Sequence, residues 1–311
     1  MATQNLYYPY KRISSLEALG KVLNCSPKEI LKLCKNAECL YSVFYEQKKS
    51  NGYRKLVRVN HQLQAVQKKI HLNILKKVIY PTYLIGSISG RDAKTNAQAH
   101  CHSKILFKED IANFFPNITV HHVFDIWKNF FKFEHNVALC LTRLTTFRGA
   151  LPQGTSTSPL LANLVLYKRE SSFNQWCCNN GLTYTRFVDD ISISARGRID
   201  PKMKTMVLNK LCGMLISMGF QIKRSKHAIE TSRAHMTVMN IGINRTQATV
   251  SHQYRKKLRA EICQLQKTQY SEKSLLSTQG KVKHVKRYHP NYAQKLQLSL
   301  NEVKQLNKLN K

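Results

Sequence analysis

Acidic residues are scarce in this sequence of 311 residues: 17 Asp and Glu stand against 50 Lys and Arg, which gives a formal net charge of +33. A field of this sign attracts polyanions such as nucleic acids, and the release of counterions drives their binding. A protein that only bound nucleic acid would gain nothing from carboxylates facing the phosphates, because they would repel the ligand. An enzyme that handles phosphates through metal ions requires such carboxylates. The few acidic residues therefore separate these two classes of protein.

Long apolar runs and secretion signals are also missing. No stretch of about 18 uninterrupted apolar residues occurs, so we expect no membrane-spanning helix. The N-terminal residues lack the basic start and apolar core of a signal peptide, and we expect a cytoplasmic protein. The nine cysteines fall at irregular positions, which disfavours a zinc site and predicts buried, reduced thiols.

Asp189-Asp190 is an acidic pair between two stretches of alternating side chains. Residues 183–188 and 191–194 both follow a period of two. This pattern predicts a β-hairpin with the acidic pair at its tip. Two carboxylates held there could share divalent metal ions in front of a nucleic-acid phosphate. By itself, the dipeptide is more often a solvated turn.

A third carboxylate, Asp110, ends a strand-like run over 104–110, and Pro116 stops any strand from continuing. Asp110 would complete a site for two metal ions. Phe115 lies five positions after it, where the ring could sit beneath an incoming sugar or could simply pack in the core.

A loop of small side chains over 151–159 leads into a predicted helix, with Ser158 as N-cap and Pro159 at the first helical position. Its backbone amides could approach a nucleotide closely, or the loop could be an ordinary helix cap.

The motifs around Asp110, Gln153-Gly154 and Asp189-Asp190 resemble, in their order, the palm motifs of reverse transcriptases. Residues 219–222, followed by Lys226, resemble the next palm motif, and 239–243 stand where the primer-grip hairpin belongs. The family usually carries Tyr-Ala-Asp-Asp at the hairpin tip, so residues 187–188 depart from its pattern while the acidic pair is intact. The resemblance covers most of the chain and implies an RNA-directed DNA polymerase with an α+β right-hand fold of fingers, palm and helical thumb.

The resemblance also implies roles for individual residues. Asp110, Asp189 and Asp190 would hold two Mg²⁺ ions. Lys226 would lie near the triphosphate and could act as an acid for pyrophosphate. The nucleotide pocket would be formed by Phe115, which would exclude a 2′-hydroxyl, and by Gln153, Gly154, Lys48 and Arg54. Lys48 and Arg54 could instead belong to a solvated basic turn.

Three segments follow from this assignment. Residues 1–103 would form N-terminal helices and fingers, 104–250 the palm with inserted fingers helices at about 120–150, and 251–311 a basic helical thumb. Within them the patterns predict helices in 14–40, 62–80, 120–147, 159–179 and 201–218, and paired strands at 41–45 and 55–59. Ser26 and Glu29 form a capping box.

Asn96-Ala97 and His100 resemble the Asn-Ala-x-x-His signature of bacterial retron reverse transcriptases. That branch implies a dedicated structured noncoding RNA as template and primer, an RNA–DNA hybrid, dNTPs, an RNA-linked single-stranded DNA product (msDNA), and antiphage defence with an effector protein. The residues expected to contact RNA are Asn96, His100, Tyr254, Lys256, Lys257, Arg259, Lys283, Lys286 and Arg287. Asn96 and His100 could instead satisfy buried polar groups.

Retron enzymes typically carry Val-Thr-Gly in the primer-grip region, where this chain has 238–242 with a different sequence. Another bacterial defence-associated or group II intron-like reverse transcriptase is therefore the alternative assignment. A non-catalytic RNA-binding protein is the alternative from a different class.

Overall fold

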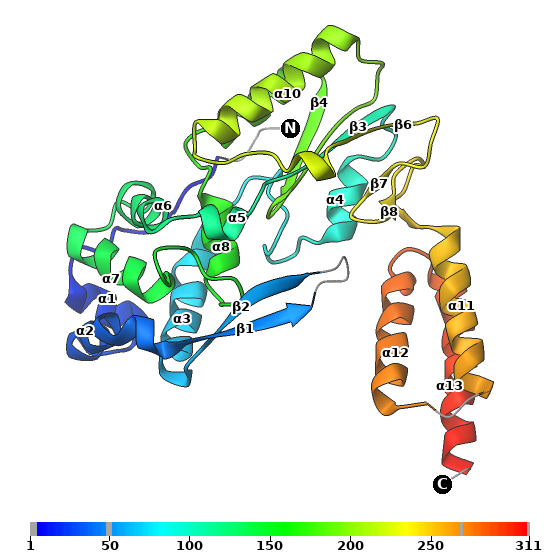
Figure 1. The fold of residues 1–311 in the computed structure, drawn as a ribbon, viewed down its shortest axis with the longest axis horizontal. Coiled ribbons are helices and arrows are strands. Elements are labelled where there is room, and N and C mark those ends of the chain that lie inside the picture. Colours follow the sequence, from blue (N-terminus) through cyan, green and yellow to red (C-terminus); the bar gives the residue numbers. More distant parts are fainter. Residues whose placement is uncertain (1–4, 48–51, 268–269, 310–311) are drawn as a thin grey trace.

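The computed structural model describes residues 5–47, 52–267 and 270–309, and side chains up to residue 303 in the last helix. Helices and sheets alternate along the chain (Figure 1), and the α+β prediction is confirmed at this level. None of the helices in these ranges has the length and apolar character that a membrane crossing needs.

The N-terminal part packs helices beside a two-stranded hairpin. Its elements are α1 (Leu16–Leu23), α2 (Pro27–Asn36), β1 (Tyr41–Gln47), β2 (Tyr53–Val59) and α3 (His61–Asn73). The predicted capping box is confirmed, because the Glu29 carboxylate accepts the Ser26 backbone N–H at 2.7 Å and the Ser26 hydroxyl accepts that of Glu29. The predicted helix over 62–80 ends earlier, at Asn73, and only a 3₁₀ turn follows.

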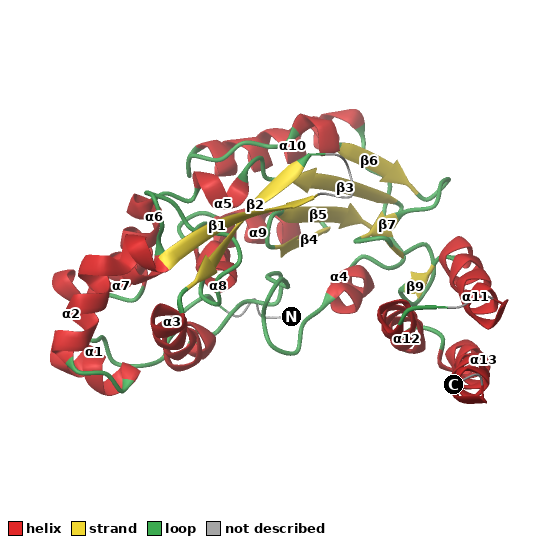
Figure 2. Cartoon of the chain, turned by 60° about the horizontal axis from the view of Figure 1, so that its bottom comes forward, coloured by secondary structure: helices red, strands yellow, loops and turns green. Residues whose placement is uncertain are grey.

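A four-stranded antiparallel sheet with the order β4-β5-β3-β6 forms the centre. Its strands are β3 (Ile105–Asp110), β4 (Leu182–Phe187), β5 (Asp190–Ala195) and β6 (Ala228–Thr231). Two helices, α9 (Glu170–Asn179) and α10 (Pro201–Ile216), lie over one face, and the short α4 (Ala93–Ala99) lies against the other (Figure 2). The predicted apolar face of α10 is confirmed, since Val207, Leu211, Met214 and Leu215 are buried.

Two predicted details between β3 and β4 are wrong. The helical stretch after the small-residue loop is divided into α8 (Ser158–Leu164) and α9, and Thr157 rather than Ser158 is the residue before α8. Ser158 is already helical, and its hydroxyl lies 2.6 Å from that of Thr155. The break lets the chain change direction, and Glu170 at the start of α9 is buried against the sheet. The remaining helical elements here are α5 (Phe114–Asn117), α6 (Val120–Asp125), a π-helical turn (Ile126–Phe130) and α7 (His135–Thr145).

The C-terminal part begins with a small sheet of β7 (Thr237–Val238), β8 (Ile241–Gly242) and β9 (Thr249–Val250). Met239 and Asn240 turn between β7 and β8 with φ angles of 50° and 63°, so the hairpin expected at 239–243 is present. Three helices follow with an apolar core of their own (Figure 1): α11 (His252–Lys267), α12 (Glu272–Lys286) and α13 (Pro290–Leu309).

The cysteines are reduced, as predicted, but they are not all buried. All nine carry free thiols, and Cys39, Cys178 and Cys263 are exposed.

Candidate active site

Asp110 and Asp190 lie directly opposite each other in the central sheet. Asp110 is the last residue of β3, Asp190 is the first of β5, and the two are register partners. Cβ atoms in such a pair are roughly 5 Å apart. The Glu109 side chain lies on the sheet face that α10 covers. Because adjacent side chains of a strand alternate between faces, Asp110 and its partner Asp190 lie on the opposite face. Two of the three predicted carboxylates therefore meet at one edge of the open face.

Asp189 lies in the two-residue turn that joins β4 to β5. The Ile111 N–H donates to the Asp189 carbonyl at 3.0 Å, which ties this turn to the end of β3. Burial raises the pKa of Asp189, the charge of Asp110 adds to this, and the Lys226 and Arg54 cations oppose it. All three predicted carboxylates thus share one electrostatic environment.

Burial, followed by the charge of Asp189, raises the pKa of Asp190 to about 6. Lys226 forms an ion pair with the Asp110 carboxylate, which is only 5% exposed. Like charges held this close favour a cation between them, and carboxylate oxygens are hard donors that suit a divalent ion such as Mg²⁺. Within the described ranges, no three His, Cys, Asp or Glu side chains already surround a single point. The donor chemistry fits a metal site, while Lys226 supplies the cation that now neutralises Asp110.

Arg186 fixes the turn from inside the protein. The guanidinium is fully buried and donates to the Glu170 carboxylate at 2.5 and 2.7 Å. It also donates to the carbonyl of Val188 at 2.9 Å. Although burial alone would lower it, the Glu170 charge holds the pKa of Arg186 above its ordinary value. The Arg186 guanidinium therefore stays protonated and holds the Val188 backbone, next to Asp189, in place.

Val188 occupies the turn with a φ angle of 61°, which a β-branched side chain rarely adopts. Gly86 makes this position possible. A Cβ atom on Gly86 would lie 2.6 Å from Val188 Cγ2 and 2.7 Å from the Val188 nitrogen. Such distances exclude any side chain at Gly86 unless the turn moves. The position of Asp189 therefore depends on a residue that is 103 positions away in the sequence.

Comparison with known proteins agrees with this geometry. Residues 46–277 match the family model described as reverse transcriptase (RNA-dependent DNA polymerase). The chain belongs to the reverse transcriptase family. It is 33% identical to the retron Se72 reverse transcriptase of Salmonella heidelberg (strain 579083-10) over 230 residues, which cover 74% of this chain and 61% of that relative. It is 26% identical to the retron Ec86 reverse transcriptase of Escherichia coli over 254 residues, which cover 80% and 78%.

A third relative is the retron Mx65 reverse transcriptase of Myxococcus xanthus, 26% identical over 274 residues that cover 82% of this chain and 63% of the relative. The chain thus spans less than two thirds of the Salmonella and Myxococcus relatives. The resemblance to retron-type reverse transcriptases that the motifs indicated is confirmed by these similarities.

In this reverse transcriptase the loop of Gln153 and Gly154 is held to β2. The Val57 N–H donates to the Gln153 carbonyl at 2.9 Å, and a Cβ on Gly154, whose φ is 111°, would lie 2.8 Å from the Val57 carbonyl oxygen. The approach of Gly154 to β2 therefore explains the absence of a side chain there, and its contact with a nucleotide stays a prediction. Arg54 projects from the same strand β2, and Lys48 lies outside the described residues.

Phe115 is the second residue of the short helix α5, which begins at Phe114, and its half-buried ring meets that of Phe114 edge-on with centroids 6.1 Å apart. It lies five positions after Asp110 along the chain, and its role in selecting the sugar stays a prediction.

Asn96 and His100 do not form a surface for RNA, contrary to the sequence interpretation. They are 1% and 0% exposed. The ring nitrogens of His100 lie 2.8 Å from the Ser194 hydroxyl and 2.7 Å from that of Thr185, which itself donates to the Asn96 side chain at 2.6 Å. Burial lowers the pKa of His100 to about 4. The two residues fasten α4 to the sheet, which is the alternative that the sequence left open.

The predicted RNA contacts of the C-terminal helices divide into two groups. Five cations are exposed as expected: Lys256, Lys257, Arg259, Lys283 and Lys286. Tyr254 is half-buried, with its ring centroid 6.2 Å from that of His284. Arg287 forms an ion pair with Asp92, and its carbonyl accepts the Lys94 ammonium at 2.6 Å. Arg287, which is also exposed, therefore connects α12 to α4, and its contact with RNA stays a prediction.

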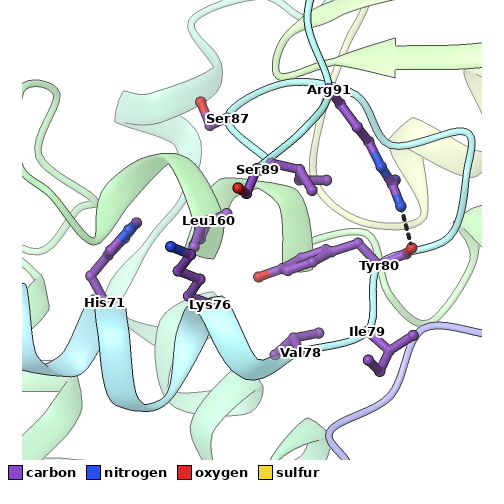
Figure 3. A pocket seen from close by; sticks show the side chains of 10 residues that line it. His71, Lys76, Val78, Ile79, Tyr80, Ser87, Ser89, Arg91 and Leu160 are labelled. Carbon is purple, nitrogen blue, oxygen red and sulfur yellow. Dashed lines mark hydrogen bonds between the residues drawn. The ribbon is translucent and has the colours of Figure 1, made fainter. Parts of the chain in front are cut away.

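A cavity of about 540 Å³ was missed by the sequence interpretation. His71 on α3 and Lys76 on the 3₁₀ turn that follows it point toward Ser87 and Ser89, and Leu160 of α8 forms an apolar wall (Figure 3). Arg91 on its rim donates to the carbonyls of Tyr80 at 2.8 Å and Leu84 at 2.5 Å. No motif unites these residues, and a basic pair at 76–77 after an apolar helix was the only signal.

Proposed function

We propose that this protein is an RNA-directed DNA polymerase of a bacterial retron. In this proposal residues 1–103 form the fingers region, 104–250 the palm and 251–311 the thumb. The protein copies a dedicated structured noncoding RNA into RNA-linked single-stranded DNA, in the cytoplasm. It acts in antiphage defence together with an effector protein. Membership of the reverse transcriptase family and the similarity to retron enzymes support the proposal.

The observation that carries the polymerase assignment is the pairing of Asp110 with Asp190 on the open face of the sheet, next to Asp189 and Lys226. Buried carboxylates beside one another cost free energy unless cations neutralise them. Their presence at one site of a strongly basic protein therefore favours a site that binds metal cations. Two Mg²⁺ ions held by these carboxylates would activate the primer 3′-hydroxyl and stabilise the charge of the leaving pyrophosphate.

The other groups around the carboxylates position the reactants. Lys226, which pairs with Asp110 here, would supply a cation for the triphosphate and a proton for the leaving group if the carboxylates held metal ions. Arg54 on β2 lies close enough to affect Asp189 electrostatically and contributes a second cation for the triphosphate. Arg186, through the Val188 carbonyl, keeps the turn that carries Asp189 in place.

The cavity beside α3 fits one nucleotide of the template strand. Lys76 and His71 supply donors for a phosphate, and Val78 with Leu160 supplies an apolar surface for a base. Gly86, which contacts the catalytic turn, directly precedes the cavity residues 87–89. A strand in this cavity would therefore lead directly to the metal site.

Replacement of both Asp189 and Asp190 by Ala tests the proposal. DNA synthesis on a primed RNA should disappear, while affinity for the RNA should stay, because binding depends on the basic surfaces. Glu272→Ala, which removes an exposed carboxylate at the start of α12, is the matched control and should keep full synthesis. Residual primer extension by the double variant would refute the metal site. A wild type that binds RNA but never extends a primer would favour the non-catalytic alternative.

A further inference from the structure

A groove with a volume of about 870 Å³ runs between α9 and α10. It lies on the outer side of these helices, which cover the sheet face opposite Asp110 and Asp190, and α10 is far from the C-terminal helices in both views (Figures 1 and 2). Nothing in the proposed polymerase reaction uses this surface. The residues that form its floor are Phe173, Trp176, Met206, Gly213, Met214 and Ser217.

The outer face of α10 has an apolar residue that the core does not bury. Lys202, Met206, Gly213 and Ser217 recur at helical spacings along this face, and Met206 is 45% exposed. Methionine and aromatic side chains on a surface are typical of sites that accept another helix.

Gly213 supports the same conclusion. It lies inside the 16-residue helix α10, where glycine costs about 1 kcal/mol relative to alanine. A Cβ atom at this position would meet no heavy atom within 4 Å, so packing within the described chain does not require glycine. The missing side chain leaves room for the backbone or side chain of an additional element to approach α10 closely.

The charges on the groove identify the chemistry of that element. Among the described residues that line it, every charged one is basic: Arg169, Lys202 and Lys210. An apolar floor between basic edges is complementary to a helix with an apolar face and acidic flanks. A second copy of this chain does not match it, because no helix in the described ranges contains more than one acidic residue. Nucleic acid matches the basic edges but not a floor that includes two methionines.

We propose that the groove between α9 and α10 binds an acidic amphipathic helix of a partner protein. Because the groove and the carboxylates lie on opposite faces of the sheet, the partner can stay bound while nucleic acid occupies the polymerase site. This proposal is independent of the polymerase assignment, since it depends only on the outer surface of the two helices.

Tryptophan fluorescence of the full-length protein gives a direct readout. The chain has two tryptophans, and Trp127 is fully buried whereas Trp176 lines the groove. The probe is a synthetic helix of about 18 residues, about five turns, with Leu and Phe on one face and Glu elsewhere. We expect a saturable blue shift with a dissociation constant in the micromolar range, or about −8 kcal/mol. Trp176→Phe should remove the signal, and a shuffled peptide of the same composition should bind at least about tenfold more weakly.

Gly213→Phe fills the floor without changing the charge and should weaken binding at least about tenfold. Gly280→Phe is the matched control, because Gly280 is also inside a helix with no atom within 4 Å of its Cβ position, but on α12. Replacement of both Lys202 and Lys210 by Glu should also weaken peptide binding, and it leaves the groove unfilled. This second variant tests the proposal even if the Gly213→Phe protein does not fold.

Several results would overturn the proposal. One is the absence of any Trp176 response at about 100 µM peptide, a concentration well above a micromolar dissociation constant. Another is equal binding of the designed and shuffled peptides. A third is displacement of the peptide by RNA together with unchanged peptide binding in Gly213→Phe, because the peptide would then bind to the nucleic-acid surface. A Trp176 shift caused by a single-stranded oligonucleotide and lost in Gly213→Phe would identify the groove as a nucleic-acid site instead.

Discussion

Acidification should destabilise the protein through His100, and the size of the effect follows from its burial. The ring is fully buried between the Thr185 and Ser194 hydroxyls, and its pKa falls from 6.5 to about 4 on folding. Between these two values the unfolded chain binds a proton that the folded protein rejects, so the free energy of unfolding decreases as the pH falls. A pKa difference of about 2.5 units between the unfolded and folded states changes the free energy of unfolding by at most about 3.4 kcal/mol. Between about pH 7.5 and pH 5, about 2 kcal/mol of this is lost.

Other groups titrate in the same range, and Asp190, whose pKa rises on folding, changes stability in the opposite direction. The measurement is therefore a difference between the wild type and His100→Gln, which stays neutral at every pH. Urea unfolding, followed by tryptophan fluorescence at both pH values, should show the wild type more stable at pH 7.5. Its advantage should shrink by about 2 kcal/mol at pH 5. A difference that is independent of pH would refute the buried, neutral state of His100.

Three further outcomes are expected. Gly86→Ala should lower kcat by at least about tenfold because its Cβ would displace Val188. Val188→Ala should not restore the activity, because the backbone nitrogen at that position stays 2.7 Å from the added Cβ, and an unchanged kcat in Gly86→Ala would show that the turn tolerates the contact. Phe115→Ala should raise the incorporation of ribonucleotides relative to deoxyribonucleotides in primer-extension assays, and an unchanged ratio in an active variant would contradict its role. Neutralisation of the exposed α11 cations Lys256, Lys257 and Arg259 should weaken RNA binding and reduce the dependence of the affinity on salt concentration. An unaltered salt dependence would show that RNA binds to another surface.

Much of the local structure was predictable from the sequence because it depends on near neighbours. The alternation on both sides of Asp189 predicted the hairpin, and the structure has β4 and β5 there. The capping box at Ser26 and the apolar stripe of α10 were predicted for the same reason, since caps and helical faces are set within a few residues. The order of the motifs also indicated the family, although not how the residues between them contribute.

Tertiary structure alone decided the residues that hold the site together. Arg186 and Glu170 read as ordinary surface charges until the fold buries them as a pair behind the turn. His100 has no sequence feature that separates an RNA contact from a buried bond to Thr185, 85 positions away. The close approach of Gly154 to β2 likewise has no signal in the sequence. Periodicity reports which face of an element is apolar, but which distant polar group meets a given side chain depends on the packing of the whole chain.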